Sequence, residues 1–154
     1  MTGANDNKKP MTPSKEDYLK AIWSLSERRV GQGEASTGDL AAALSVSPPA
    51  VSKMLKQMEQ QELVAHTPYY GVRLSAQGRA VAIKIVRRHR LLELFLAEVL
   101  GYAPHAVHDE AERLEHHISD EFEGRIDQLL GYPRECPHGS PIPTSGGEIS
   151  MTRG

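Results

Sequence analysis

The sequence of 154 residues lacks the features of a secreted or membrane protein. Its single cysteine, Cys136, excludes a framework of internal disulfides and is typical of the reducing cytoplasm. No apolar run approaches the roughly 20 residues that a membrane-spanning helix needs, and the N-terminus does not have the pattern of a signal peptide. With 39% hydrophobic and 25% charged residues, the chain is predicted to be a soluble cytoplasmic protein of one domain, or of two small domains that share a core.

The net charge of −2 conceals a segregation of charge along the chain. Residues 1–90 contain fourteen Lys and Arg against eight Asp and Glu, whereas residues 91–154 contain four against twelve. A basic first part suggests a polyanionic partner, and an acidic second part suggests cations. The two parts are therefore expected to bind ligands of opposite charge.

The first part begins with residues 1–12, which are polar and rich in turn formers and are predicted to be disordered. Apolar residues then recur at helical spacing in three stretches, which predicts helices over residues 13–25, 39–44 and 48–61. The last two helices are joined by a short connection, residues 45–47, as in a helix-turn-helix.

A wing is predicted directly after these helices. Two β-like runs, residues 63–67 and 72–74, flank the turn signal Pro68-Tyr69-Tyr70-Gly71. Helix-turn-helix patterns by themselves give many false positives, and an ordinary amphipathic helix with a solvated Lys and Gln face would have the same pattern. The adjoining wing and the local positive charge favour a DNA-binding domain over residues 13–76.

The helix over residues 48–61 would read the DNA, because its first exposed turns carry small, short polar and basic side chains. Small residues could touch a thymine methyl group, hydroxyl and amide groups could bind a base or a phosphate, and lysines suit phosphates. The residues expected to contact double-stranded DNA are Ser47, Pro49, Ala50, Ser52, Lys53, Lys56 and Gln57.

The second part of the chain is predicted to be helical. Long helices are expected over residues 79–100 and 104–130, the first ended by Gly101. They would form a helical domain over residues 77–143, and the Pro-, Gly- and Ser-rich residues 144–154 would be a flexible tail. The predicted fold class is mostly α, with an N-terminal winged helix-turn-helix followed by a helical domain.

Metal-ligand side chains are concentrated on one flank of the last predicted helix. His108, Glu112 and His116 are spaced i, i+4 and i+8 with Glu115 between them, so they fall within an arc of about 100°. A polar cluster of imidazoles and carboxylates beside a core face is what a divalent-metal site needs. The adjacent face, which is expected to be buried, comprises Val107, Ala111, Leu114, Ile118 and Phe122.

A second pair of ligand-type residues, His89 and Glu93, has the same i, i+4 spacing on the preceding helix. For any one of these residues, a solvated acidic face is the alternative interpretation. The set as a whole favours metal, because imidazoles and carboxylates together are ligands of first-row divalent cations.

The order of these motifs resembles a known family. Residues 14–19 (Ser-Lys-Glu-Asp-Tyr-Leu) come first, the helix-turn-helix follows, and residues 88–93, 108–116 and 137–143 come after it. With order and spacing both kept over residues 13–143, the chain is similar to the metal-dependent repressors typified by the diphtheria toxin repressor and the manganese transport regulators.

The resemblance implies two metal sites, a winged helix that binds DNA, and a homodimer held by the helices after it. The primary site would be formed by Asp17, Glu112, Glu115 and His116. An ancillary site, known in the iron-type members, would be formed by His89, Glu93 and His108. Metal binding would hold the first helix to the C-terminal half and thereby set the two recognition helices of a dimer for operator binding.

The ligand types indicate which metal is the effector. Iron-type relatives place Met and Cys at the positions of Asp17 and Glu112, whereas this chain has hard carboxylates at both, which favours Mn²⁺ with Fe²⁺ as the alternative. Manganese-type relatives with a closely spaced metal pair have Glu where this chain has Lys20, so that arrangement is not expected. Cys136 and His138 are further candidate ligands, the alternative being a small buried Cys in a surface loop.

Many relatives continue into a third, SH3-like domain, which is expected to be absent or truncated here. The predicted function is a metal-responsive transcriptional regulator, for which repression is the family expectation. One rival is a winged-helix regulator of a small organic effector, with the acidic helix as a dimer face. The other is a helical di-metal enzyme, but its Glu-x-x-His pairs are absent, because Arg113 and Leu114 stand three residues before His116 and His117. An enzyme is therefore not expected.

Overall fold

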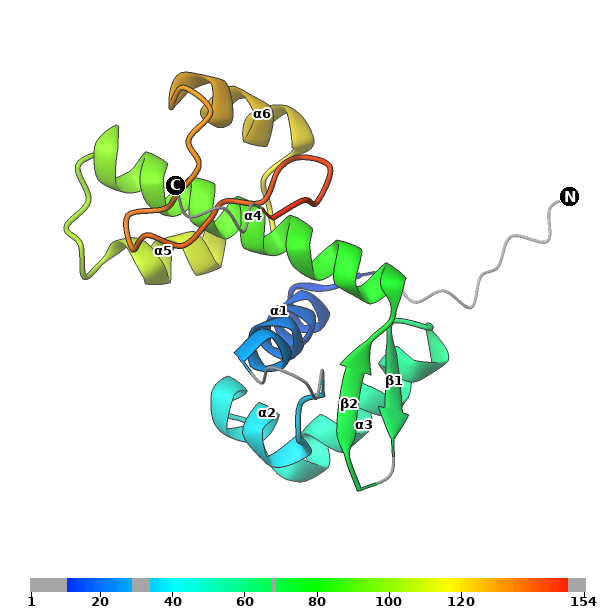
Figure 1. The fold of residues 1–154 in the computed structure, drawn as a ribbon. Coiled ribbons are helices and arrows are strands. Elements are labelled where there is room, and N and C mark those ends of the chain that lie inside the picture. Colours follow the sequence, from blue (N-terminus) through cyan, green and yellow to red (C-terminus); the bar gives the residue numbers. More distant parts are fainter. Residues whose placement is uncertain (1–10, 29–33, 68, 150–154) are drawn as a thin grey trace, which may run out of the picture. The chain divides into compact units, whose positions relative to one another are not determined.

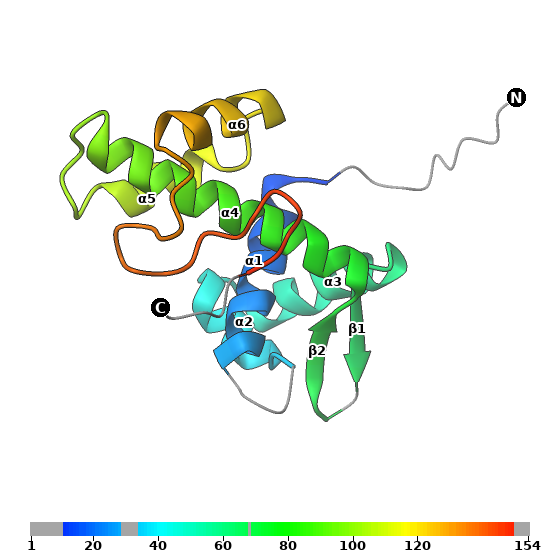
Figure 2. The same ribbon diagram turned by 45° about the horizontal axis from the view of Figure 1, so that its top comes forward.

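The computed structural model describes residues 11–28, 34–67 and 69–149 of the chain, which divides into two units, residues 1–82 and 83–154 (Figures 1 and 2). The segment that was expected to be disordered lies outside the described residues except for its last two. Within the described ranges, no helix combines the length and apolar character needed to cross a membrane.

The described part of the first unit contains three helices and a hairpin. They are α1 (Pro13–Arg28), α2 (Thr37–Leu44), α3 (Pro48–Gln60), β1 (Val64–Thr67) and β2 (Gly71–Leu74). Both short helices begin at serine caps: the Ser36 hydroxyl accepts from the Asp39 amide, and the Ser47 hydroxyl accepts from the Ala50 amide. Ser45, in the left-handed conformation with φ 55°, ends α2 and turns the chain towards α3. Local capping therefore defines the helix-turn-helix.

Strands β1 and β2 form the antiparallel hairpin expected for the wing, in a register that places Val64 opposite Leu74. The hairpin is fixed by Ala35, whose amide donates to the Val72 carbonyl at 2.7 Å and whose carbonyl accepts from the Val72 amide at 2.8 Å. A Cβ on Gly71 would lie 2.4 Å from the Ala35 carbonyl oxygen, so only glycine fits there. The apolar core of this unit includes the fully buried Leu19, Ile22, Leu40, Val51, Met58 and Val72.

Helix α4 (Ala76–Glu98) begins in the first unit and continues into the second, where α5 (Val107–Leu114) and α6 (Asp120–Leu129) follow. The prediction of one helix over residues 104–130 is wrong, because the chain leaves the helical path between α5 and α6. The Ser119 hydroxyl accepts from the Phe122 amide and acidic residues fill the next turn, so a new helix begins there. The predicted ligand cluster therefore lies on α5 and on the turn that follows it.

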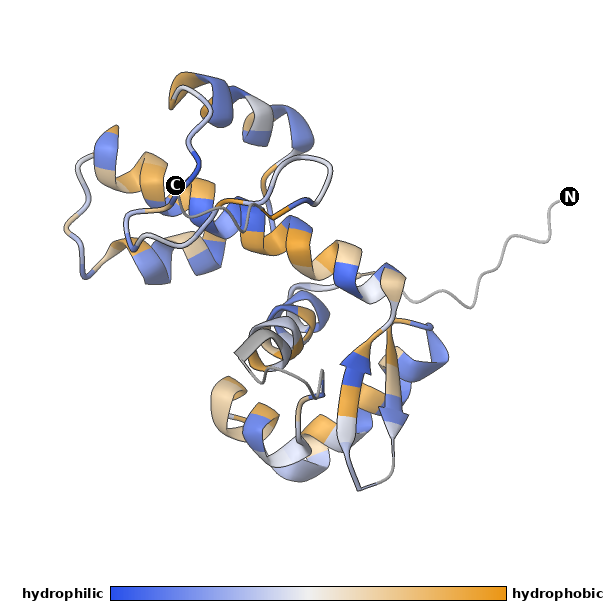
Figure 3. Cartoon of the chain, viewed as in Figure 1, coloured by the Kyte–Doolittle hydropathy of each residue, from blue (hydrophilic) through white to orange (hydrophobic). Residues whose placement is uncertain are grey.

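The core of the second unit combines α4 with α5, α6 and the C-terminal segment. Its buried members are Leu91, Leu92, Leu94, Leu96, Val107, Ala111, Ile126, Cys136 and Ile142. Leu114 and Phe122, which were expected to be buried, are 36% and 43% exposed. The helix break explains the exposure of Phe122, which belongs to the separate helix α6. From there its ring meets the ring of Phe95 on α4 edge-on. Figure 3 shows apolar residues along α4 and a mostly hydrophilic α6.

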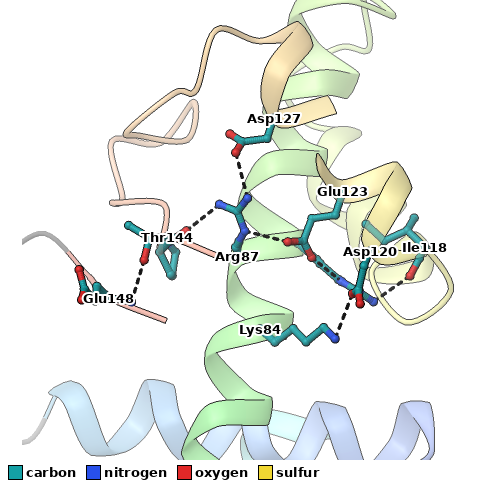
Figure 4. A network of polar contacts seen from close by, with 10 residues as sticks. Lys84, Arg87, Ile118, Asp120, Glu123, Asp127, Thr144 and Glu148 are labelled. Atoms are coloured by element: carbon teal, nitrogen blue, oxygen red, sulfur yellow. Dashed lines mark hydrogen bonds and ion pairs between the residues drawn. The ribbon is translucent and has the colours of Figure 1, made fainter. Parts of the chain in front are cut away.

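Buried ion pairs join α4 to α6 (Figure 4). Arg87 donates through Nε to Glu123 at 2.8 Å and through Nη2 to Asp127 at 3.0 Å. Arg88 donates through Nε to the other carboxylate oxygen of Glu123 at 2.7 Å. Beyond this network the chain makes a hydrogen-bonded turn over residues 144–148, at the start of the segment expected to be a flexible tail.

Candidate functional site

Glu93 on α4 is the centre of the candidate metal site in the second unit. It is 3% exposed, and its Oε2 accepts no hydrogen bond from the residues that the structure describes. His89 Nε2 lies 3.3 Å from Glu93 Oε1. The Nδ1 atoms of His108 and His138 lie 3.5 and 3.6 Å from Oε2. A buried carboxylate oxygen without a donor carries a desolvation cost that a bound cation would remove.

Two groups of donor atoms share this carboxylate, and within each group the atoms lie within 4.8 Å of one another. One group is the ancillary set expected from the resemblance: His89, Glu93 and His108. The other adds the two candidate ligands of the C-terminal segment: Glu93, Cys136 and His138. The structure thus brings four other predicted ligands around the Glu93 carboxylate.

The charge state of Glu93 favours cation binding. Burial by itself would raise the pKa of Glu93, but the hydrogen bond with His89 and the charges of His89, His138 and His108 outweigh it and lower the pKa. The carboxylate is therefore held in its charged form. Because protonated imidazoles would compete with a metal ion for this charge, acid is expected to weaken metal binding.

Glu115, at the end of α5, connects the predicted primary set, to which it belongs, with the predicted ancillary set. Its fully buried carboxylate lies 2.6 Å from His89 Nδ1 through Oε1 and 3.7 Å from His116 Nε2 through Oε2. His89 Nε2 in turn lies 3.2 Å from His108 Nδ1. The His89 imidazole therefore contacts both Glu115 of the primary set and His108 of the ancillary set. Sequence spacing could not reveal this contact, because 26 residues separate His89 from Glu115.

Glu112 and Asp17 are placed differently from the other predicted ligands. Glu112 is exposed, and its carboxylate lies 3.2 Å from His108 Nε2. Asp17 lies on α1 of the first unit. The grouping of Asp17 with Glu112, Glu115 and His116 therefore stays a prediction.

The loop that carries Cys136 and His138, residues 134–143, is here named the Cys136 loop. Two arginines of α4 that were not among the predicted site residues bind its backbone. Arg87 Nη1 donates to the Pro143 carbonyl at 2.9 Å, and Arg90 Nη1 donates to the Pro141 carbonyl. These contacts join residues 56 and 51 positions apart, so no local signal in the sequence identifies them.

Most of the residues predicted to contact DNA are exposed on or next to α3, and their contact with DNA stays a prediction. Its buried side consists of Val51, Leu55 and Met58. On the opposite side Ser47, Pro49, Ala50, Ser52, Lys53 and Lys56 are exposed, and Gln57 is half-buried. The Ser47 hydroxyl also caps α3, so it fixes the end of the helix that would enter the major groove.

Sequence models of two domains match nearly the whole chain. Residues 10–72 match "Iron dependent repressor, N-terminal DNA binding domain", and residues 75–144 match "Iron dependent repressor, metal binding and dimerisation domain". The HTH-type transcriptional regulator MntR of Geobacillus kaustophilus is 37% identical over 124 residues, which are 80% of this chain and 85% of that protein. The chain belongs to the iron-dependent repressor family. The predicted fold class is thereby confirmed, with a DNA-binding domain before a metal-binding and dimerisation domain.

Some members of the iron-dependent repressor family are longer than this chain. The diphtheria toxin repressor of Corynebacterium glutamicum is 37% identical over 143 residues, which are 93% of this chain and 61% of that repressor. A solved structure of the manganese regulator SloR has 44% identity and a TM-score of 0.79, over 93% of this chain and 65% of that one. A manganese-dependent transcriptional repressor in complex with manganese has 43% identity and a TM-score of 0.81, over 90% and 63%. The chain spans about three fifths of the length of the Corynebacterium repressors.

Proposed function

We propose that the protein is a metal-responsive transcriptional regulator, a cytoplasmic homodimeric repressor that binds operator DNA when a divalent metal is bound. The observation that carries the proposal is the buried Glu93 carboxylate, whose Oε2 faces two imidazoles and accepts no hydrogen bond from the part of the chain that the structure describes. The exposed polar and basic face of α3 supports the DNA-binding part.

The donors fit first-row divalent cations. Asp17, Glu112 and Glu115 would supply hard oxygen ligands beside one imidazole, which favours Mn²⁺ as the effector, with Fe²⁺ as the alternative. Around Glu93 the imidazoles and the Cys136 thiol are softer, so this group would also accept later divalent metals. We therefore assign the effector role to the set that contains Asp17.

Mutual repulsion of carboxylates would provide the switch. Asp17 belongs to the unit that reads DNA, whereas Glu112 and Glu115 belong to the other unit. Brought together without a counter-charge, these groups repel, which would leave α1 free of the second unit. A bound divalent cation would supply the positive charge that lets the three share one site. The two α3 helices of a dimer would then be held for successive faces of the major groove.

The second unit offers apolar surface for a homodimer. Its large exposed apolar residues lie after α4, at the end of α5, and on and after α6: Val99, Leu100, Tyr102, Leu114, Phe122, Leu129 and Tyr132. Gathered into one patch, exposed apolar residues of this kind would mark a protein interface. The dimerisation named in the family description supports placing the dimer contact on this unit.

DNA binding with and without metal tests the proposal. A duplex selected by Mn²⁺-loaded protein from a random-sequence library would be titrated by fluorescence anisotropy in MnCl₂ or in chelator. We expect Mn²⁺ to tighten binding about 5- to 150-fold, and the duplex to tighten Mn²⁺ binding by the same factor. Equal DNA affinity in Mn²⁺ and in chelator would overturn the proposal. A calorimetric titration without heat of Mn²⁺ binding would favour an organic effector instead.

A further inference from the structure

Three residues of α4 face the Cys136 loop in succession: Arg87, Arg90 and Glu93. Their spacing of i, i+3 and i+6 places them on one flank of the helix, within about 120°. Arg87 binds the Pro143 carbonyl, and Arg90 binds the Pro141 carbonyl one turn later. Glu93, a further turn along, meets the donor atoms of the loop. The loop is therefore held to α4 at three consecutive turns, in the reverse chain direction.

The Cys136 loop is closed by its own backbone before it meets α4. The Cys136 amide donates to the Ser140 carbonyl at 2.9 Å, and the Gly139 amide donates to the Cys136 carbonyl at 2.9 Å. Pro141 and Pro143 have no N–H, so their carbonyls are the only backbone hydrogen-bonding groups they offer. Both carbonyls are bound by arginines of α4, which fixes the stem of the loop and leaves its tip beside Glu93.

Arg87 is itself held in place by carboxylates of α6. The guanidinium of Arg87 is bound on its other side by Glu123 and Asp127 of α6, as Figure 4 shows. Arg90 lies among the site residues: burial lowers the pKa of Arg90, and the charges of Cys136 and Glu93 act to raise it. Supporting groups that fix the orientation of ligands raise metal affinity without touching the ion.

We propose that Arg87 and Arg90 are positioning residues that hold the loop so that Cys136 and His138 join Glu93 in binding a metal. Without them the loop would have to be ordered at the expense of binding free energy. The ion would then keep only the donors of α4 and α5. The two arginines thereby control whether the Cys136 thiolate can bind the metal. A bound thiolate would make the site prefer softer cations over Mn²⁺. The inference rests on the proposed function in taking the donors around Glu93 to bind metal.

Cobalt titration tests the inference, because a Co²⁺–thiolate bond gives a near-ultraviolet charge-transfer band and the chain has one cysteine. In the metal-free full chain, we expect Co²⁺ to produce this band in the wild type and not in Cys136→Ser. Arg90 is half-buried, so Arg90→Ala is expected to leave the fold intact. The Co²⁺ affinity measured at the band should fall about 10- to 100-fold in this variant.

Matched variants separate positioning from general damage. Arg90→Lys keeps the charge but lacks the planar fork, so its affinity should lie between those of the wild type and Arg90→Ala. Arg125→Ala removes an exposed arginine of α6 and should leave the band unchanged. Arg87 belongs to a buried network, so it is replaced by Lys rather than Ala. Circular dichroism and thermal unfolding of the metal-free variants report whether each one folds.

Wild-type Co²⁺ affinity at the thiolate band in both Arg90→Ala and Arg87→Lys would overturn the inference. Absence of the thiolate band in the wild-type protein would also overturn the inference. The proposed function would not be affected, because it is tested separately by Mn²⁺-dependent DNA binding. Conversely, a thiolate band that depends on Arg90 in a protein whose DNA affinity ignores Mn²⁺ would retain the inference and reject the regulator.

Discussion

The two units place their charged residues in opposite ways. Among the described residues, the first unit buries one charged side chain, that of Lys15, in an otherwise apolar core. Up to residue 149, where its description ends, the second unit buries six polar and charged side chains: Arg87, Arg88, His89, Glu93, Glu115 and Glu123. Buried ions are a weak source of stability, because desolvation offsets much of their attraction. Their concentration in one unit therefore indicates a task other than folding.

DNA binding and metal binding require functional side chains in different environments, exposed in one case and buried in the other. In the proposed function, a phosphate would be reached by exposed cations such as Lys53, which lose little hydration on folding. A metal ion would be held better by a carboxylate such as Glu93, which is shielded from water and has its position fixed by its neighbours. The proposed DNA contacts of the first unit are thus exposed, whereas Glu93 of the second unit is buried.

Glu123→Ala is expected to have the largest effect on this contrast. It removes the shared, buried partner of two buried guanidinium groups, Arg87 and Arg88. Among the described residues, Arg87 then keeps Asp127 and Arg88 keeps the exposed Asp120 as carboxylate partners. We expect the free energy of unfolding to fall by about 3–5 kcal/mol, measured by urea denaturation of the metal-free protein. Glu121→Ala, which removes an exposed acid of the same helix, should cost less than about 1 kcal/mol. Equal losses in the two variants would show that the second unit does not depend on its buried ions.

Asp17→Ala should sharpen the comparison, because it removes the predicted ligand that belongs to the DNA-reading unit. The variant should keep its fold and its metal-free DNA affinity, and lose about 1–3 kcal/mol of coupling between Mn²⁺ and DNA. Glu112→Ala should do the same from the second unit. The measurement is the anisotropy titration with Mn²⁺ and with chelator, and Glu16→Ala, at the neighbouring carboxylate of α1, is the control. Undiminished coupling in Asp17→Ala would remove this residue from the switch.

Lys53→Ala should have the smallest effect and act on the first unit alone. Loss of one phosphate contact should reduce the slope of log affinity against log salt concentration by about 0.9, while the Mn²⁺ affinity of the free protein stays unchanged. Lys84→Ala removes an exposed lysine of the second unit, paired with Asp120, and serves as the matched control. An unchanged slope in Lys53→Ala would mean that the exposed face of α3 does not contact the DNA backbone.

Much of the first unit could be predicted from the sequence, because its boundaries are set by short signals. Ser47 followed by Pro48 marks the start of α3, and the turn before Gly71 marks the hairpin. The prediction of a single helix over residues 104–130 was wrong because a short signal of this kind was overlooked. Apolar spacing continued across the break, and it outweighed Ser119 and the acidic turn after it, which mark a new helix.

Of the candidate metal site, the sequence supplied the ligand types and the pairs one turn apart, such as His89 with Glu93. It could not supply the burial of Glu93, its use by two groups of donors, or the contact of His89 with Glu115. Each of these depends on which face of α4 meets α5 and the Cys136 loop.

The sequence by itself determined the helices of the first unit, their serine caps and the kinds of ligand, because the interactions that define them join residues within about four positions. Only the tertiary structure decided which ligands share a carboxylate and which arginines hold the loop beside it. The contact of Arg87 with the Pro143 carbonyl spans 56 positions, and that of His89 with Glu115 spans 26. The packing of the second unit brings such residues together, and the local spacing of residues does not predict these contacts.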